Sequence, residues 1–343
     1  MAQRNNIKIS DSWKNAEMTG REWLRSFRNR HTDLSLRKSE PCILARATSF
    51  NRDNVNRFFN NLYAVINWNG AFSDGRRIYN LNETASTTVQ KRQKILAPKE
   101  NKCLGKVTSG EKGMLVTTCS FICAGGYALP PAIIFPRKNY KDFMLKGAPT
   151  GSLGLATLTG WMNSELFIEI MKHCIKHSRT SPDNPSILIF DNHESYLSIE
   201  ALDLAKSVGV NIVTLHPHTS AKLQPLDVGL YTPFKTCYNS ATESWLLRNP
   251  GRPLSIYDLA ECIGVAHSRS MTLTNIAHTF NKCGIYPSDR DIFTDQDFLL
   301  SEVTNRSCLN DEKSNNTRDL HGGEHNDEIT VPNENDSSAA NYI

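Results

Sequence analysis

Two short apolar runs, joined by one predicted helix, constrain the fold of this chain more than any other feature. The runs are SILIF (residues 186–190) and VNIVTL (residues 210–215). A continuous apolar run of this length is typical of a strand buried on both faces, as parallel strands are. Residues 198–207 fit the connecting helix, so the segment predicts a β-α-β unit. We therefore expect an open α/β sheet with helices on both faces.

Further elements are predicted on either side of this unit. They are a strand ending at Asn82, strands at 114–123 and 127–135, and helices at 53–66, 163–177 and 229–247. Gly125-Gly126 is a hairpin signal between the second and third strands. The Pro130-Pro131 pair predicts that the third strand is an edge strand or a bulged one. The order β-β-β-α-β-α-β-α indicates a mixed sheet.

The charge of the chain is divided unevenly between its body and its end. The net charge is +4, but residues 301–343 contain nine acidic and three basic residues. Residues 1–300 therefore carry 36 basic against 26 acidic residues, which is +10. A basic body can bind a polyanion by neutralising phosphates, although a solvated charged surface explains the same balance equally well. The polar, acidic end is expected to be disordered because it cannot bury enough apolar surface.

Several classes of protein are not expected. No stretch approaches the roughly 18 consecutive apolar residues of a membrane span. The first 15 residues lack the apolar core of a secretory signal. Nine cysteines without a C-x-x-C motif are typical of reduced thiols. We expect a soluble intracellular protein.

One helix with a basic face is predicted near the start, over residues 17–31. Thr19 and Glu22 have the spacing of a capping box, which begins a helix. The basic residues of this segment are Arg21, Arg25, Arg28 and Arg30. They are candidates for phosphate contacts, and a solvated helix face is the alternative.

Two aspartates follow the neighbouring apolar strands. Asp191 directly follows SILIF, and Asp227 lies in LQPLDVG beyond VNIVTL. Ligands of open α/β sheets bind at the carboxyl ends of strands, and carboxylates there could hold Mg²⁺. Each aspartate alone is also an ordinary turn or helix-cap residue, so spacing alone leaves the choice open.

A family resemblance adds to this interpretation. The motifs that carry it are IYNLNET (78–84), ALPPAIIFPRK (128–138), GWMNSELF (160–167), Asp191-Asn192-His193, Pro217-His218-Thr219-Ser220, Leu223-Gln224-Pro225-Leu226-Asp227 and NKCGIYPSD (281–289). Over about residues 20–300 the chain resembles DDE-superfamily transposases of the pogo, Tigger and jerky type, relatives of centromere protein B. The resemblance implies a ribonuclease H-like catalytic domain that uses Mg²⁺ or Mn²⁺ on DNA.

The resemblance also implies an organisation for the whole chain. Residues 1–69 would be the remnant of a helical DNA-binding segment, residues 70–300 the ribonuclease H-like domain, and residues 301–343 the disordered tail. The implied partner is DNA and the implied compartment is the nucleus, with no membrane association. A homodimer is compatible with this organisation.

The chain departs from the family at the first metal-binding position. Three aspartates hold metal in the family, and the first falls at Asn82. Asparagine offers a neutral oxygen, and losing even an indirect metal partner costs about 10–100-fold. Glu83 is a poor substitute because successive strand side chains point to opposite faces. Other motif positions that differ from the family are Ala85, Tyr196 and Ala221.

Three interpretations stay open at this point. The first is a transposase-derived DNA-binding protein with impaired catalysis, in which Asp191 and Asp227 are the surviving metal ligands. The second is an endonuclease in which Asn82 and water complete the metal shell. The third is an interaction scaffold that uses neither metal nor DNA.

Histidine pairs at His173 and His177, and at His216 and His218, are weaker candidates for a zinc site. Neither pair has further ligands at a recognisable spacing.

Overall fold

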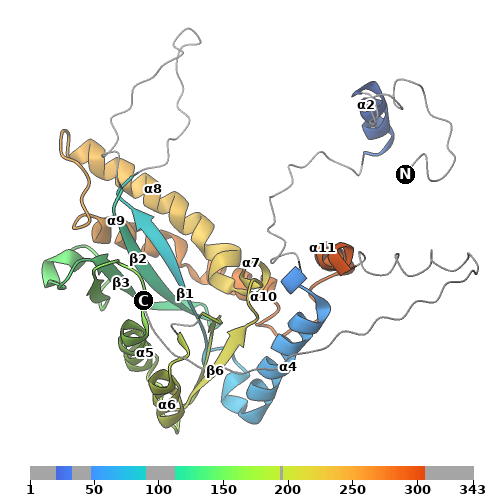
Figure 1. Ribbon diagram of the computed structural model, residues 1–343, viewed down its shortest axis with the longest axis horizontal. Coiled ribbons are helices and arrows are strands. Elements are labelled where there is room, and N and C mark those ends of the chain that lie inside the picture. Colours follow the sequence, from blue (N-terminus) through green and yellow to red (C-terminus); the bar gives the residue numbers. More distant parts are fainter. Residues whose placement is uncertain (1–20, 33–47, 90–112, 194–195, 306–343) are drawn as a thin grey trace, which may run out of the picture.

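The computed structural model describes residues 21–32, 48–89, 113–193 and 196–305 (Figure 1). The helices are α2 (Arg21–Arg30), α4 (Arg52–Trp68), α5 (Ser164–Ser178), α6 (Ile199–Val208), α7 (Ser220–Leu223), α8 (Tyr231–Arg248), α9 (Leu259–Ser270), α10 (Leu273–Lys282) and α11 (Asp295–Asn305). Short 3-10 turns lie at Gly70–Phe72 and Asp142–Leu145, and a π-helical turn, η5, spans Leu226–Leu230. The strands are β1 (Ile78–Thr87), β2 (Leu115–Cys123), β3 (Tyr127–Pro136), β4 (Leu153–Thr157), β5 (Ser186–Asp191) and β6 (Val210–Leu215).

The six strands form one mixed sheet in the order β4-β3-β2-β1-β5-β6. Strands β1, β2 and β3 form an antiparallel meander, and β5 and β6 continue the sheet parallel to β1. A meander extended by two parallel strands is the ribonuclease H-like arrangement, so the expected fold class is confirmed. The parallel extension follows from the apolar runs, since strands buried on both faces need crossover helices.

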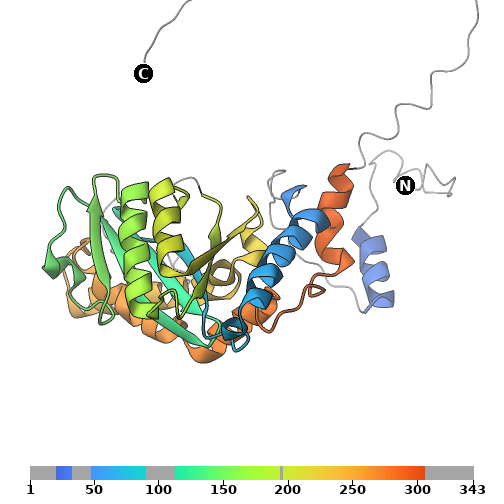
Figure 2. The same cartoon turned by 90° about the horizontal axis from the view of Figure 1, so that it is seen from below.

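Helices cover both faces of the sheet, and strand β1 shows how its side chains divide between them (Figures 1 and 2). Tyr79 and Leu81 point to the face covered by α5 and α6, where they join a buried cluster with Phe167. Ile78 points to the opposite face, where it joins a cluster with Phe59 of α4. Helices α8 and α9 cover the β2 and β3 part of that second face. This alternation decides which residues of β1 can reach the candidate site.

Strand β4 was not predicted, and it decides between the two alternatives expected for β3. It pairs in parallel with β3, so β3 is an inner strand although it contains Pro130 and Pro131. The alternative of a bulge is confirmed, because the register between β2 and β3 shifts between Cys119 and Phe121. The sequence LGLAT gave little signal for β4. Its Gly154 is required because a Cβ there would lie 2.0 Å from the Tyr140 ring.

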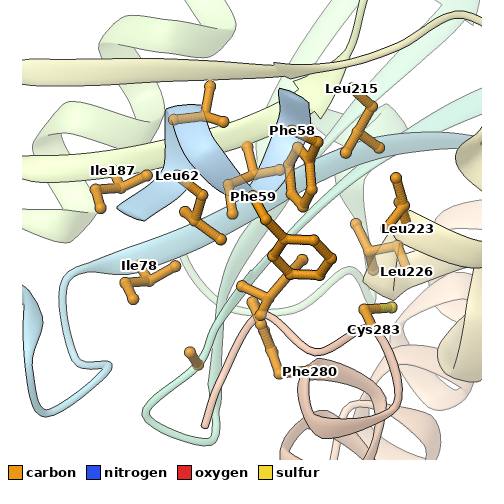
Figure 3. Packing of buried hydrophobic residues seen from close by; sticks show 14 of the residues in the cluster. Phe58, Phe59, Leu62, Ile78, Ile187, Leu215, Leu223, Leu226, Phe280 and Cys283 are labelled. Atoms are coloured by element: carbon orange, nitrogen blue, oxygen red, sulfur yellow. The ribbon is translucent and has the colours of Figure 1, made fainter. Parts of the chain in front are cut away.

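Helix α4 is anchored to the sheet by a cluster of buried aromatic and aliphatic side chains (Figure 3). Asn51 caps the helix by accepting a hydrogen bond from the backbone N–H of Asn54 at 2.9 Å. Phe58, Phe59 and Leu62 are buried against β1, β5, β6 and α10. The predicted boundary at residue 69 therefore falls just after a helix that shares its core with the sheet.

The ends of the chain lie mostly outside the described residues. Thr19, the predicted cap of α2, lies outside, as do residues 306–343 of the predicted tail. Residues 301–305 belong to α11, whose Phe298 joins the same buried cluster as α4. Disorder of the remaining tail stays a prediction.

Truncation of Phe59, whose side chain is fully buried, to alanine should lower the free energy of unfolding by about 3–5 kcal/mol, because it leaves a cavity between α4 and the sheet. Trp68→Ala is the control in the same helix, since Trp68 is 68% exposed. That change should stay within about 0.5 kcal/mol. Urea denaturation of both variants measures the difference, and equal losses would contradict the packing of α4.

Candidate active site

The first and second predicted metal positions come from neighbouring strands of the sheet. Strands β1 and β5 pair in parallel as far as Asn80 opposite Ile189, and Asn82 and Asp191 each lie two residues beyond that pair. Ile78 and Ile189 belong to the same buried cluster. Because side chains alternate, Asn82 and Asp191 therefore point to the same face as these two isoleucines.

The second and third positions both line a cavity of about 550 Å³. The cavity is lined by Asp191, Asn192, His193, Pro217, His218, Ser220, Ala221 and Asp227. Asp227 is exposed in the first turn of η5. Asn82 is 8% exposed and is not among the lining residues. The structure thus brings both predicted carboxylates to one cavity, with the asparagine behind them.

A buried amide network fixes the segment that carries the third position. Asn80 donates from Nδ2 to the Ile189 carbonyl at 2.9 Å and to the side-chain oxygen of Gln224. Its Oδ1 accepts from the backbone N–H of Leu226 at 3.1 Å, and Gln224 donates to the Leu81 carbonyl at 3.0 Å. The side chains of Asn80 and Gln224 are both inaccessible to solvent. Sequence reasoning missed their role, although a polar residue inside an apolar strand was the available signal.

Two hydroxyl groups add to this clamp. Tyr231 donates to the Asn82 carbonyl at 2.6 Å, and Thr279 of α10 donates to the Pro225 carbonyl. Burial raises the pKa of Tyr231 well above its usual value, so its hydroxyl keeps the proton that it donates. The chain around Asn82 and the η5 turn is therefore held by donors from two separate helices.

The donor set fits a hard divalent cation. Oδ1 of Asp191 is buried and has no hydrogen-bond donor among the described residues. Burial raises the pKa of this carboxyl, and the charge of His193 opposes the rise. A buried carboxylate oxygen without a donor leaves a lone pair for a metal, and Asp227 adds a second carboxylate at the same cavity. Within the described part of the chain, no group of three His, Cys, Asp or Glu side chains has metal-binding geometry.

Glu83, the acid next to Asn82, is engaged on the other face of the sheet. Its carboxylate accepts a hydrogen bond from the Tyr196 hydroxyl, and Tyr196 packs against Phe167 and Phe190 beneath α5. Burial raises the pKa of Glu83, the Tyr196 bond lowers it, and the charge of Asp191 raises it further. The expectation that Glu83 cannot replace an acid at position 82 agrees with this placement.

The loop that lines the cavity contains a strained residue. His218 has φ +66°, a left-handed conformation that is uncommon for residues other than glycine. Such strain persists only where the surrounding structure enforces it, and Thr219, next to it, is buried and donates to the His216 carbonyl at 2.6 Å.

Of the remaining candidates, His218 lines this cavity, whereas His173 and the arginines of α2 do not. Arg25, Arg28 and Arg30 are exposed on α2, and the side chain of Arg21 is outside the description. His173 is buried, and its Nε2 contacts the Pro130 carbonyl at 2.8 Å, so the ring has a structural partner.

Comparison with known proteins identifies the family of this region. Residues 112–280 match the family model of the DDE superfamily endonucleases. This match contains Asp191, Asp227 and the cavity between them. The chain carries a DDE superfamily endonuclease domain. Asn82 and Asn80 precede the matched segment.

Individual similar proteins extend the comparison. Over 189 residues (54% of the chain) it is 28% identical to the MFS-type transporter clz9 of Cochliobolus lunatus, and it spans about a fifth (20%) of that protein. None of the described helices is long and apolar enough to cross a membrane. A Mos1 transposase paired-end complex with the left transposon end is 11% identical (TM-score 0.44, 84% of this chain, 76% of that one). The Mos1 mariner paired-end complex with Mn is 12% identical (TM-score 0.45, 84% and 77%).

Removing one member of the amide network should destabilise the domain. In Gln224→Ala, the Asn80 amide and the Leu81 carbonyl lose partners while buried, and each such group costs about 1–3 kcal/mol. We expect the free energy of unfolding to fall by about 2–4 kcal/mol in urea denaturation. Asn281→Ala, an exposed amide on α10, is the control and should change it by less than about 0.5 kcal/mol. A Gln224 variant as stable as this control would show that the network contributes nothing.

Proposed function

We propose that this chain is a transposase-derived, DNA-binding protein whose endonuclease domain is catalytically impaired by Asn82. One observation carries the proposal: Asp191 and Asp227 line the same cavity, and Asn82 lies two residues beyond the last β1–β5 pair, as Asp191 does on the neighbouring strand. The position that would complete a three-carboxylate set is thus occupied by a neutral amide.

The proposed cofactor is Mg²⁺ or Mn²⁺, held by Asp191 and Asp227. Two such ions, when bound, stabilise the attacking and leaving oxygens of a phosphodiester. The chain contributes two negative charges in place of three, because the Asn82 oxygen is uncharged. The clamp by Gln224 and Tyr231 keeps the rest of the site in place. The missing charge, rather than a distorted fold, is the proposed cause of impairment.

The charge distribution supports DNA as the partner. Residues 1–300 carry a net +10, and exposed arginines recur along α2. Phosphate neutralisation by such residues gives sequence-independent affinity. The nucleus is the proposed compartment because the proposed partner is DNA, and a homodimer stays a prediction.

Restoring the acid should restore strand cleavage. With Mg²⁺ or Mn²⁺ and a supercoiled plasmid, we expect Asn82→Asp to nick DNA at least about 10–100 times faster than the parent chain, because the variant regains a charged ligand. Gel electrophoresis of the relaxed product measures the rate.

The double variant Asn82→Asp, Asp191→Asn is the matched control. It keeps the restored acid but loses the neighbouring carboxylate, so its rate should return to that of the parent. Nicking by the parent chain at the rate of Asn82→Asp would contradict the proposed impairment and favour a working endonuclease.

DNA binding should depend on salt and on α2. We expect the parent chain to bind a labelled duplex with an affinity that falls as salt rises. Substituting Arg25, Arg28 and Arg30 by alanine should reduce the slope of log affinity against log salt by about 2–3, since each neutralised phosphate contributes about 0.9. Fluorescence anisotropy measures both slopes. Absence of binding by the parent chain at low salt would overturn the proposal and favour a scaffold.

A further inference from the structure

A second, smaller cavity adjoins the candidate active site on the side of α4. It has a volume of about 130 Å³ and shares Asn192 and Pro217 with the larger cavity. Its other lining residues are Asn54, Arg57, Phe58, Asn61, Thr214, Leu215 and His216. We call this cavity the α4 groove. Neither the predicted metal ligands nor the predicted DNA-contacting arginines belong to it.

The sheet register places the α4 groove one strand away from the candidate metal site. Asp191 at the end of β5 is opposite Leu215 at the end of β6. Neighbouring strands are about 4.8 Å apart, so the groove begins directly beside Asp191. On the other wall, Phe58 packs in the same buried cluster as Leu215, which fixes α4 against β6 (Figure 3).

Polar side chains of α4 face this groove in a helical row. Asn54, Arg57 and Asn61 are three and four residues apart, so they lie on one side of the helix. Asn54 is oriented by donating from Nδ2 to the Ser49 carbonyl at 2.8 Å. Arg57 and Asn61 are exposed. The row therefore offers amide and guanidinium groups on a wall that the buried Phe58 holds in place.

Arg57 is the basic group available to a ligand here. Among the described residues that line the groove, Arg57 is the one lysine or arginine. It forms no ion pair with another described residue. The nearby cations Arg52 and Lys222 are each paired, with Asp295 and Asp297 respectively. An unpaired guanidinium favours a phosphate, which it can bind through two parallel hydrogen bonds.

The size of the groove favours part of a polymer over a free small molecule. Sites for small ligands usually enclose about 300–1,000 Å³, more than the volume of the α4 groove. A strand whose phosphodiester lies between Asp191 and Asp227 would pass Asn192 and Pro217 to enter it. We propose that the α4 groove binds the DNA strand next to the phosphodiester at the candidate active site, with Arg57 contacting a backbone phosphate. This inference rests on the proposed function.

Salt-dependent DNA binding by the full chain tests the groove. With a fluorescein-labelled duplex in anisotropy titrations, Arg57→Ala should bind about 10-fold more weakly at low salt, as expected for a hydrogen bond to a charged group. The slope of log affinity against log salt should fall by about 0.9, and Asn61→Arg should raise it by a similar amount. Both positions are exposed on α4, so thermal unfolding should match the parent chain.

Controls on other helices separate a local contact from a general loss of charge. Arg269→Ala removes an exposed arginine of α9, which packs over β2 and β3. Asn281→Arg adds a charge on α10. Arg269→Ala should lower the slope less than Arg57→Ala does, and Asn281→Arg should raise it less than Asn61→Arg does.

Each outcome has a definite meaning. If the parent chain binds DNA but Arg57→Ala matches it in affinity and slope, the proposal that the α4 groove binds DNA is overturned, and the proposed function stands. Equal effects of Arg57→Ala and Arg269→Ala overturn the groove in the same way. If the parent chain does not bind DNA at low salt, both proposals fail.

Discussion

The buried pairing of Asn80 with Gln224 is the interaction on which the candidate site depends. The pairing joins β1, β5 and the turn that leads to Asp227. Each side-chain nitrogen and oxygen of Asn80 and Gln224 has a hydrogen-bond partner, so none of these buried atoms is left unsatisfied. Hydrophobic packing brings these elements together but does not set their register to within a hydrogen bond. The directional amide contacts do so, and they hold the turn that brings Asp227 to the same cavity as Asp191.

Two walls of different character meet at this site. On the sheet side, the alternation of β1 sends Asn82 toward Asp191 and sends Glu83 to Tyr196 on the opposite face. On the other side, the loop before α7 and the η5 turn are irregular, with His218 in a left-handed conformation. A rigid sheet edge facing a constrained loop is the usual arrangement of sites in α/β proteins, where regular strands position what the loops vary.

Much of this arrangement could be predicted from the sequence, for identifiable reasons. The apolar runs SILIF and VNIVTL predicted the parallel strands. An acid directly after the first run and another in the segment beyond the second predicted that Asp191 and Asp227 lie at one edge. Strand β4 could not be predicted, because LGLAT owes its conformation to pairing with β3 and to the Tyr140 ring above Gly154. The groove beside α4 could not be predicted either. It is formed by residues more than 130 positions apart, and no local pattern links Arg57 to His216.

The alternation of β1 also limits where a third acid could arise at this site. Glu83 cannot take the place of an acid at position 82 by a small shift, because a slip of one residue would move every side chain of β1 to the opposite face and take Tyr79 and Leu81 out of the cluster that they form with Phe167. Recovery therefore has to occur at position 82 itself. In the genetic code, asparagine and aspartate codons differ by a single nucleotide. As long as the amide network and the two carboxylates at the cavity persist, one point mutation separates the present sequence from one with acids at positions 82, 191 and 227.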